Sequence, residues 1–271
     1  YDLRDSDRVV LRGFSFHLSG YDVEPRVAML HNAIEACLFS REVGHSADIV
    51  SMGGGFAVDY LDRRAWDRFR TQETGDWYFT GKPTASLYPY SSDPAGAHML
   101  RRVLCDTDAG QGVAVAERAR AHGLSIMAEP GRALCDGAGI SVFTVRGVHA
   151  HPDGTDVITV SGTSLSLSEQ WFGSEFLPDP ELVSRHNSTP SAAPPAQQHP
   201  AVVAGSTCLD SDLLSRRRIP FARKPQVGDF VIYPNTAGYQ MDSNESEFHQ
   251  VPVPPKLTLN RTGTTTTWSL T

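Results

Sequence analysis

The pattern of apolar and polar residues changes character near the middle of the chain, and its first part alternates between strand and helix patterns. Residues 7–20 carry β-branched and aromatic residues before a polar turn, which predicts a strand with His17 and Ser19 at its carboxyl end. After Pro25, apolar residues recur at steps of three and four, which predicts an amphipathic helix with proline in its first turn. These apolar residues are Val27, Leu30, Ile34 and Leu38.

The same alternation continues along the next hundred residues. Residues 47–58 show a short apolar strand pattern that runs into three consecutive glycines. Residues 111–123 predict a helix that ends at Gly123, and another strand follows at once. Between them, about residues 61–98 are rich in aromatic side chains and predict an insertion. Because strands alternate with helices, we expect a parallel sheet or barrel.

From residue 140 the pattern is that of strands without helices between them. Residues 140–162 contain two alternating runs around a Pro-Asp-Gly turn, which predicts a β-hairpin. The stretch at about 185–200 is rich in Pro, Ala and Ser and predicts a mobile loop. We therefore expect an α/β domain over residues 1–139, followed by a mainly antiparallel β domain over residues 140–271.

Composition narrows the classes of function. The chain has 271 residues, 24 Lys and Arg against 31 Asp and Glu, and a net charge of −7. Such a balance argues against a nucleic-acid or membrane surface, and no apolar run has the length of a membrane span. Four cysteines are widely spaced without a Cys-x-x-Cys pair, which favours free thiols and a cytoplasmic protein. No cluster of His, Cys, Asp and Glu has the spacing of a metal site.

The sequence SIMAEPGRAL, residues 125–134, contains the most informative chemistry. A short strand pattern, expected to be buried, ends at the carboxylate of Glu129. A Pro-Gly turn and Arg132 follow directly. Two interpretations are open at this point: the two residues form an ion pair at the strand end, or the carboxylate faces a ligand.

Other candidate residues also have a structural and a functional interpretation. The glycines at 53–55 follow a strand and could cradle a phosphate through backbone N–H groups, or form only a tight turn. His17 alone is more often structural than catalytic. A buried inert cysteine is the ordinary interpretation of Cys208, and a packing side chain is an equal alternative for Tyr239.

The order of these motifs along the chain is more specific than any one of them. His-x-Ser-Gly, Gly-Gly-Gly-Phe, Glu-Pro-Gly-Arg, Gly-x-x-Cys-x-x-x-Asp and Ala-Gly-Tyr follow one another between His17 and Tyr239. This order resembles the later part of the pyridoxal-phosphate-dependent amino acid decarboxylases with the alanine-racemase-like barrel, such as diaminopimelate, ornithine and arginine decarboxylases. The resemblance implies the last strands of an (αβ)8 barrel, with an insertion at about 61–98, and then a β domain.

The resemblance also implies roles for individual residues. His17 would stack on the pyridine ring, and Glu129 would lie against the ring nitrogen. Cys208 would be offered across a homodimer interface and protonate the carbanion left after decarboxylation, while Asp212 would help bind the substrate's distal group. The cofactor phosphate would be surrounded by the following residues: Ser19, Gly54, Gly55, Gly131, Arg132 and Tyr239.

Glu129 decides between two activities found on this fold. A carboxylate against the pyridine nitrogen keeps that nitrogen protonated, because an opposite charge favours the charged form. A protonated ring is the better electron sink for decarboxylation. The related racemases place an arginine there, so Glu129 favours decarboxylation of an amino acid over racemisation or epimerisation.

The chain also departs from the family pattern. The family's Schiff-base lysine lies on the first barrel strand, whereas this chain has only Lys82, Lys224 and Lys256. We therefore expect that lysine, and the N-terminal part of the barrel, upstream of this chain. Leu209 stands where the family commonly has an acidic residue, which Asp210 could replace. A non-catalytic homologue that binds a partner or acts as a regulator is the alternative, with a racemase or epimerase third.

Overall fold

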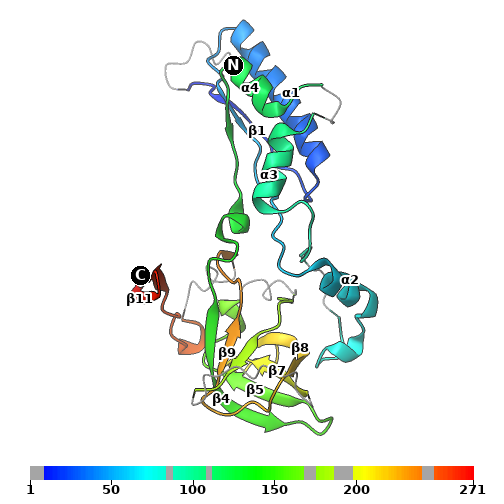
Figure 1. Cartoon of the computed structure of the whole chain (residues 1–271), viewed down its shortest axis with the longest axis vertical. Helices are drawn as coiled ribbons and strands as arrows, with labels where there is room; N and C mark the ends of the chain where they lie inside the picture. Colours follow the sequence, from blue (N-terminus) through cyan, green and yellow to red (C-terminus); the bar gives the residue numbers. More distant parts are fainter. Residues whose placement is uncertain (1–8, 84–87, 108–111, 168–174, 186–197, 240–246) are drawn as a thin grey trace. The chain divides into compact units, whose positions relative to one another are not determined.

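The computed structural model describes residues 9–83, 88–107, 112–167, 175–185, 198–239 and 247–271. The chain divides into two compact units, coloured along the sequence in Figure 1. Unit 1 comprises residues 1–63 and 89–136, and unit 2 comprises residues 64–88 and 137–271. Each unit has its own set of buried apolar side chains. The predicted domain limits, 1–139 and 140–271, stay a prediction.

Unit 1 is built on a short parallel sheet. Strands β1 (Gly13–Ser15), β2 (Ile49–Ser51) and β3 (Ser125–Met127) lie in that order, with β2 in the centre. Both pairs are parallel, and Phe14, Val50 and Ile126 lie side by side in register. This confirms the parallel sheet expected from the alternation of strand and helix patterns.

Three helices pack against one another and against this sheet. They are α1 (Val23–Glu42), α3 (Gly96–Cys105) and α4 (Val115–Ala121). The predicted helix after Pro25 and the one before Gly123 are therefore confirmed. On α1 the buried apolar stripe shares the core with β2 and the other helices, and Leu38 is only half-buried. This stripe consists of Val23, Val27, Leu30, Ile34 and Cys37.

The expectation that the strand before Glu129 is buried is wrong. In β3 only Ile126 is half-buried, and Met127 is 54% exposed. The physical reason is position, because β3 pairs only with β2 among the described strands and lies at an edge of the sheet. An edge strand needs only one apolar side chain to reach the core, so a short apolar run does not prove burial on both faces.

Unit 2 contains a larger sheet, in the order β6-β9-β4-β5-β7-β8. Neighbouring strands are antiparallel except β5 and β7, which are parallel. The predicted hairpin is confirmed by the antiparallel β4–β5 pair. The bounds are β4 (Ser141–Ala150), β5 (Asp156–Val160), β6 (Glu181–Val183), β7 (His199–Ala204), β8 (Leu213–Phe221) and β9 (Phe230–Tyr233).

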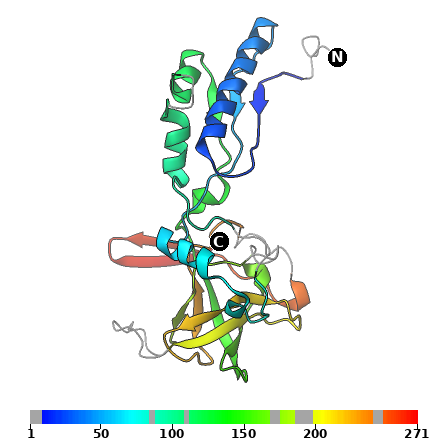
Figure 2. The same ribbon diagram turned by 90° about the vertical axis from the view of Figure 1, so that its right-hand side faces the viewer.

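The remaining elements of unit 2 are shorter. Helix α2 (Arg63–Gln72) and a 3-10 turn at Gly75–Trp77 come from the predicted insertion. The last two strands, β10 (Leu257–Thr262) and β11 (Thr265–Leu270), form a separate antiparallel hairpin, red in Figure 2. Of the loop predicted at about 185–200, residues 186–197 lie outside the described part of the chain, and residues 199–200 already belong to β7. No described helix has the length and apolar character needed to cross a membrane.

Unit 2 contains a buried ion pair between Glu175 and Arg217. Glu175 is fully buried and accepts hydrogen bonds from the backbone N–H groups of Arg216 and Arg217 at 3.1 and 3.4 Å. Nε of Arg217 lies 3.4 Å from the same carboxylate, and its Nη2 donates to Leu177 O and Asp179 at 2.9 Å. Burial raises the pKa of Glu175. The carboxylate is therefore supported by donors on β8.

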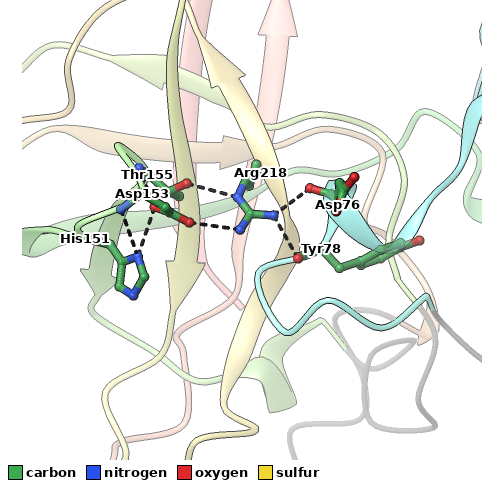
Figure 3. Close-up of polar contacts among 6 residues, drawn as sticks. All are labelled: Asp76, Tyr78, His151, Asp153, Thr155 and Arg218. Carbon is green, nitrogen blue, oxygen red and sulfur yellow. Dashed lines mark hydrogen bonds and ion pairs between the residues drawn. The ribbon is translucent and has the colours of Figure 1, made fainter.

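Arg218, the next residue on β8, connects residues 76–78 to the sheet (Figure 3). Its Nη1 donates to the carbonyl oxygens of Asp76 and Tyr78 at 2.6 and 2.8 Å. Its Nε and Nη2 donate to Thr155 Oγ1 and Asp153 Oδ2, each at 3.0 Å. Residues 76–78, which lie within the predicted insertion, are therefore held against the β4–β5 turn.

Candidate functional site

The candidate residues of unit 1 gather where the parallel strands end. Backbone pairing continues past the strands, with Phe16 N donating to Ser51 O at 3.1 Å and Glu129 N donating to Gly53 O at 2.8 Å. His17, the glycines at 53–55 and Glu129 are thereby brought to one edge of the sheet. The carboxyl edge of parallel strands is the usual place for a ligand in α/β proteins.

Close approach of three backbone segments explains why glycines occupy positions 53 and 54. Gly53 has φ +65°, and a Cβ atom there would collide with the carbonyl oxygen of Phe16. A Cβ atom on Gly54 would lie 3.0 Å from Glu129 O and 3.1 Å from Cε1 of His17. Gly54 N also lies 3.4 Å from Nδ1 of His17. The His17 ring therefore rests on the glycine loop, and larger residues do not fit there.

The residues of the Glu-Pro-Gly-Arg motif follow β3 directly. Glu129 is exposed, and within the described part of the chain its carboxylate makes no hydrogen bond or ion pair. Gly131 has φ +55° and begins a 3-10 turn, Gly131–Cys135, that contains Arg132. Of the two interpretations of this motif, the ion pair at the strand end is not formed.

Sequence reasoning did not select Arg26, a buried residue next to the glycine loop. It is on α1, is 1% exposed, and donates from Nη1 to Asp22 O at 2.8 Å and from Nη2 to Gly20 O at 2.7 Å. Burial lowers the pKa of its guanidinium. The signal was present in the pattern, because position 26 lies between Val23 and Leu30 on the apolar face of the helix.

The other predicted site residues lie in unit 2. Cys208 is exposed in the turn after β7, and the buried cysteine of the chain is Cys37, so the interpretation of Cys208 as a buried inert residue is wrong. All four cysteines are free thiols in the structure. Tyr239 is 53% exposed, which does not suit a packing side chain. Asp210 is exposed beside Cys208.

Asp212 has a different environment from Asp210. It is buried, and its Oδ1 accepts a hydrogen bond from Ser164 N at 2.7 Å. Its Oδ2 accepts from Thr207 N at 3.0 Å and from Thr207 Oγ1 at 2.7 Å. Through its two oxygens the carboxylate therefore stabilises the turn that carries Cys208 and connects it to Ser164. A contact of Asp212 with a substrate stays a prediction.

His249 is a second residue that sequence reasoning missed. Its Nδ1 lies 4.0 Å from Sγ of Cys208. The two residues are separated by 41 positions, and no spacing rule connects them. Among the described residues, no group of three His, Cys, Asp or Glu side chains is placed to hold a metal ion.

Comparison with known proteins gives a relative and a fold. No protein-family model matches the chain. The uncharacterized protein y4yA of Sinorhizobium fredii is 41% identical over 254 residues, which cover 94% of this chain and 54% of that protein. A solved diaminopimelate decarboxylase superposes with a TM-score of 0.62 at 17% identity, covering 94% of this chain and 51% of its own. The chain therefore shares the fold of this decarboxylase over about half of that protein's length.

Other solved structures share the decarboxylase fold over a similar extent. The arginine decarboxylase of Paramecium bursaria Chlorella virus, bound to agmatine, has a TM-score of 0.60 at 19% identity and covers 90% of this chain. The lysine/ornithine decarboxylase of Vibrio vulnificus, with putrescine, has a TM-score of 0.56 at 19% identity and covers 89% of this chain. This chain spans about half the length of each of these proteins, 53% and 52% respectively.

Proposed function

We propose that the chain is part of a pyridoxal-phosphate-dependent enzyme that decarboxylates an amino acid. One observation carries this proposal: His17, the glycines at 53–55 and Glu129 meet at the carboxyl edge of a parallel sheet in a decarboxylase fold. In the resembling family these motifs surround the cofactor. The partial (αβ)8 barrel and the β domain belong to the same proposal.

The residues of unit 1 fit such a cofactor. The glycine loop leaves no space for side chains, which suits a phosphate held by backbone N–H groups. Ser19 and the Gly131–Arg132 turn would add donors. The resemblance also assigns the hydroxyl of Tyr239, a residue of unit 2, to the phosphate. His17 would cover one face of the ring, and when bound the cofactor supplies an electron sink for the bond that breaks.

Glu129 would hold a proton at the ring nitrogen. Its carboxylate is exposed at the strand end and is not consumed by another described residue, so it is available to a ligand. A nearby negative charge favours the protonated, cationic form of a pyridine nitrogen. This arrangement favours loss of carbon dioxide over racemisation.

Cys208 would return a proton to the substrate. After carbon dioxide leaves, the thiol would give its proton to the α-carbon, and the resulting thiolate would take a proton from His249, whose Nδ1 lies 4.0 Å away. Asp210, being exposed, is the better candidate for the substrate's distal group, while Asp212 holds the turn in place. In the family this cysteine is offered to the partner's site, so a homodimer is part of the proposal.

The proposal concerns a protein of the length of these relatives. Lys82, Lys224 and Lys256 all lie in unit 2, and none follows a strand of the parallel sheet. We place the lysine that binds the cofactor outside residues 1–271. The test is therefore made on the full-length protein, which should develop a visible absorbance band with pyridoxal phosphate that borohydride removes, and release carbon dioxide from one member of an amino-acid panel.

Replacing Glu129 separates chemistry from cofactor binding. Glu129→Gln should keep the cofactor and lower carbon dioxide release roughly a hundredfold or more, the size typical of losing one preorganised electrostatic contact. Glu117→Gln is the matched control, because Glu117 is exposed on α4 and away from the strand ends. Unchanged release in Glu129→Gln would refute the assigned role. Absence of the absorbance band would instead favour a non-catalytic binding protein, and α-deuterium exchange without carbon dioxide would favour a racemase.

A further inference from the structure

A buried arginine connects the two loops that form the glycine-lined edge of unit 1. Besides its short bonds to Asp22 O and Gly20 O, Nη2 of Arg26 lies 3.4 Å from Gly54 O and 3.5 Å from Leu18 O. The residues 18–22 turn follows β1, and Gly54 follows β2. One guanidinium therefore reaches main-chain oxygens from both loops.

Stability alone is a poor reason to keep a charge at this position. The guanidinium is removed from water, Nε has no hydrogen-bond partner in the described structure, and an apolar residue would fit the helix face. Removing a charged group from water costs free energy, and its hydrogen bonds offset that cost fully only where every donor is satisfied, which is not so for Nε. The contacts of Arg26 point instead to the N–H groups at the opposite ends of the peptides whose carbonyl oxygens it binds.

Peptide geometry supplies the connection to a ligand. A trans peptide is planar, so a carbonyl oxygen and the next N–H point in opposite directions. Because the oxygens of Leu18 and Gly54 face Arg26, the N–H groups of Ser19 and Gly55 face away from it. These are two of the residues that the motif order had assigned to the cofactor phosphate.

We propose that Arg26 is a positioning residue for the phosphate of the cofactor, an inference that rests on the proposed function. It holds the carbonyl ends of two peptides on the interior side, which orients their N–H ends toward a dianion on the other side. Its positive charge also makes the electrostatic potential at the phosphate site more favourable for an anion. Gly55 belongs to this arrangement, because a Cβ atom there would collide with Nη2 of Arg26.

The chain offers a matched control at the other end of the same helix. Arg41 also binds main-chain oxygens, donating from Nε to Ala47 O at 2.6 Å and from Nη1 to His122 O at 2.7 Å. Residues 47 and 122 precede β2 and β3, so Arg41 ties loops at the opposite edge of the sheet. It makes the same kind of main-chain contacts as Arg26 without any relation to the strand ends that carry His17 and Glu129.

The experiment compares pyridoxal phosphate with pyridoxal, which lacks the phosphate, on the full-length protein freed of cofactor. Dissociation constants are measured by fluorescence titration for wild type, Arg26→Met, Arg26→Lys and Arg41→Met, and urea unfolding is followed for each. Arg26→Met should weaken pyridoxal phosphate binding at least about tenfold and leave pyridoxal within about twofold, the size of a few lost charge-assisted contacts. Arg26→Lys should fall between, and Arg41→Met should lose stability with the ratio of the two constants unchanged.

Each outcome bears on the proposal. Inorganic phosphate should compete with pyridoxal phosphate in wild type and much less in Arg26→Met. An unchanged ratio in both Arg26 variants, or an equal change in Arg41→Met, would overturn the positioning role while leaving the proposed function intact. If Arg26→Met does not fold, Arg26→Lys decides by the same ratio. A wild type that prefers neither ligand would overturn this inference together with the proposed function.

Discussion

Two aspartates that stand two positions apart show how strongly environment separates identical side chains. Asp210 is exposed, whereas Asp212 is buried and accepts hydrogen bonds from Ser164 and Thr207. Gly205 belongs to the same arrangement, because a Cβ atom there would collide with the Asp212 carboxylate. The motif that carries Cys208 is therefore fastened through its last residue.

Removing that fastening should cost stability. In Asp212→Ala the partly buried N–H groups of Ser164 and Thr207 lose their acceptor, and leaving such donors unsatisfied costs up to about 1–3 kcal/mol. Asp210→Asn is the control and should stay within about 0.5 kcal/mol of wild type. Urea unfolding measures both, and equal stabilities in the two variants would contradict the role of Asp212.

For single residues, the order of the motifs could be predicted from the sequence, but the burial and the contacts of each side chain could not. The spacing of Gly205, Cys208 and Asp212 is visible in the sequence, yet it does not say that the thiol is exposed and the carboxylate buried. The contact between Cys208 and His249 depends on how two distant segments fold together. Arg26 could not be predicted as a site residue because a charged residue within an apolar stripe is ordinarily taken as an interruption of that stripe.

At the scale of elements, charged side chains gather at the β4–β5 turn of unit 2 (Figure 3). Asp153 accepts from Thr155 N at 2.8 Å, its Oδ1 lies 2.9 Å from Nδ1 of His151, and its Oδ2 accepts from Arg218 at 3.0 Å. The backbone N–H of Thr155, then His151 and Arg218, hold the pKa of Asp153 well below its usual range. The ionised carboxylate is thus the form that the folded turn favours.

This depressed pKa predicts the direction of an acid effect. The unfolded chain protonates Asp153 at about pH 4, and the folded chain does so only at lower pH, so its contribution is present above about pH 4. That contribution is lost as the pH falls through the folded pKa. Asp153→Asn should therefore be less stable than wild type at neutral pH, and the difference should shrink on acidification.

Urea unfolding of the two proteins at a series of pH values tests this prediction. Glu181→Gln serves as the control, since Glu181 is exposed on β6 and outside the turn. A difference between wild type and Asp153→Asn that stays constant down to acid pH would show that the carboxylate charge does not stabilise the turn.

Elements with a strong periodic pattern could be predicted from the sequence, and burial at sheet edges could not. Steps of three and four residues after Pro25 define α1, and the Pro-Asp-Gly turn defines the β4–β5 hairpin. The exposure of β3 depends on which strand lies beside it, and that is a property of the assembled sheet. The parallel pairing of β5 with β7 inside an otherwise antiparallel sheet also has no local signal.

At the scale of the whole molecule, the chain has two hydrophobic cores that are formed by different kinds of element. Unit 1 buries the faces of three helices against a parallel sheet, while unit 2 buries the inner face of a mixed sheet, with Phe143, Val145 and Val231 among its buried residues. The chain crosses between the units after residues 63, 88 and 136. Each unit is therefore interrupted in sequence but has its own set of buried apolar side chains.

Separate cores should unfold in separate steps. Scanning calorimetry of the chain should show two transitions, with a calorimetric enthalpy larger than the van't Hoff enthalpy of either. Asp212→Ala should lower only the transition of unit 2, and Arg41→Met only that of unit 1. A single two-state transition that both variants shift equally would show that the two cores unfold as one.

The way Arg26 makes its bonds has a consequence for how this protein can diverge. The guanidinium contacts main-chain oxygens, so the side chains of Leu18 and Asp22 carry none of its hydrogen bonds. Point substitutions there would leave the contact in place, whereas inserting or deleting a residue between positions 18 and 22 would move the oxygens out of reach. Distant homologues should therefore vary in the composition of this turn while keeping its length.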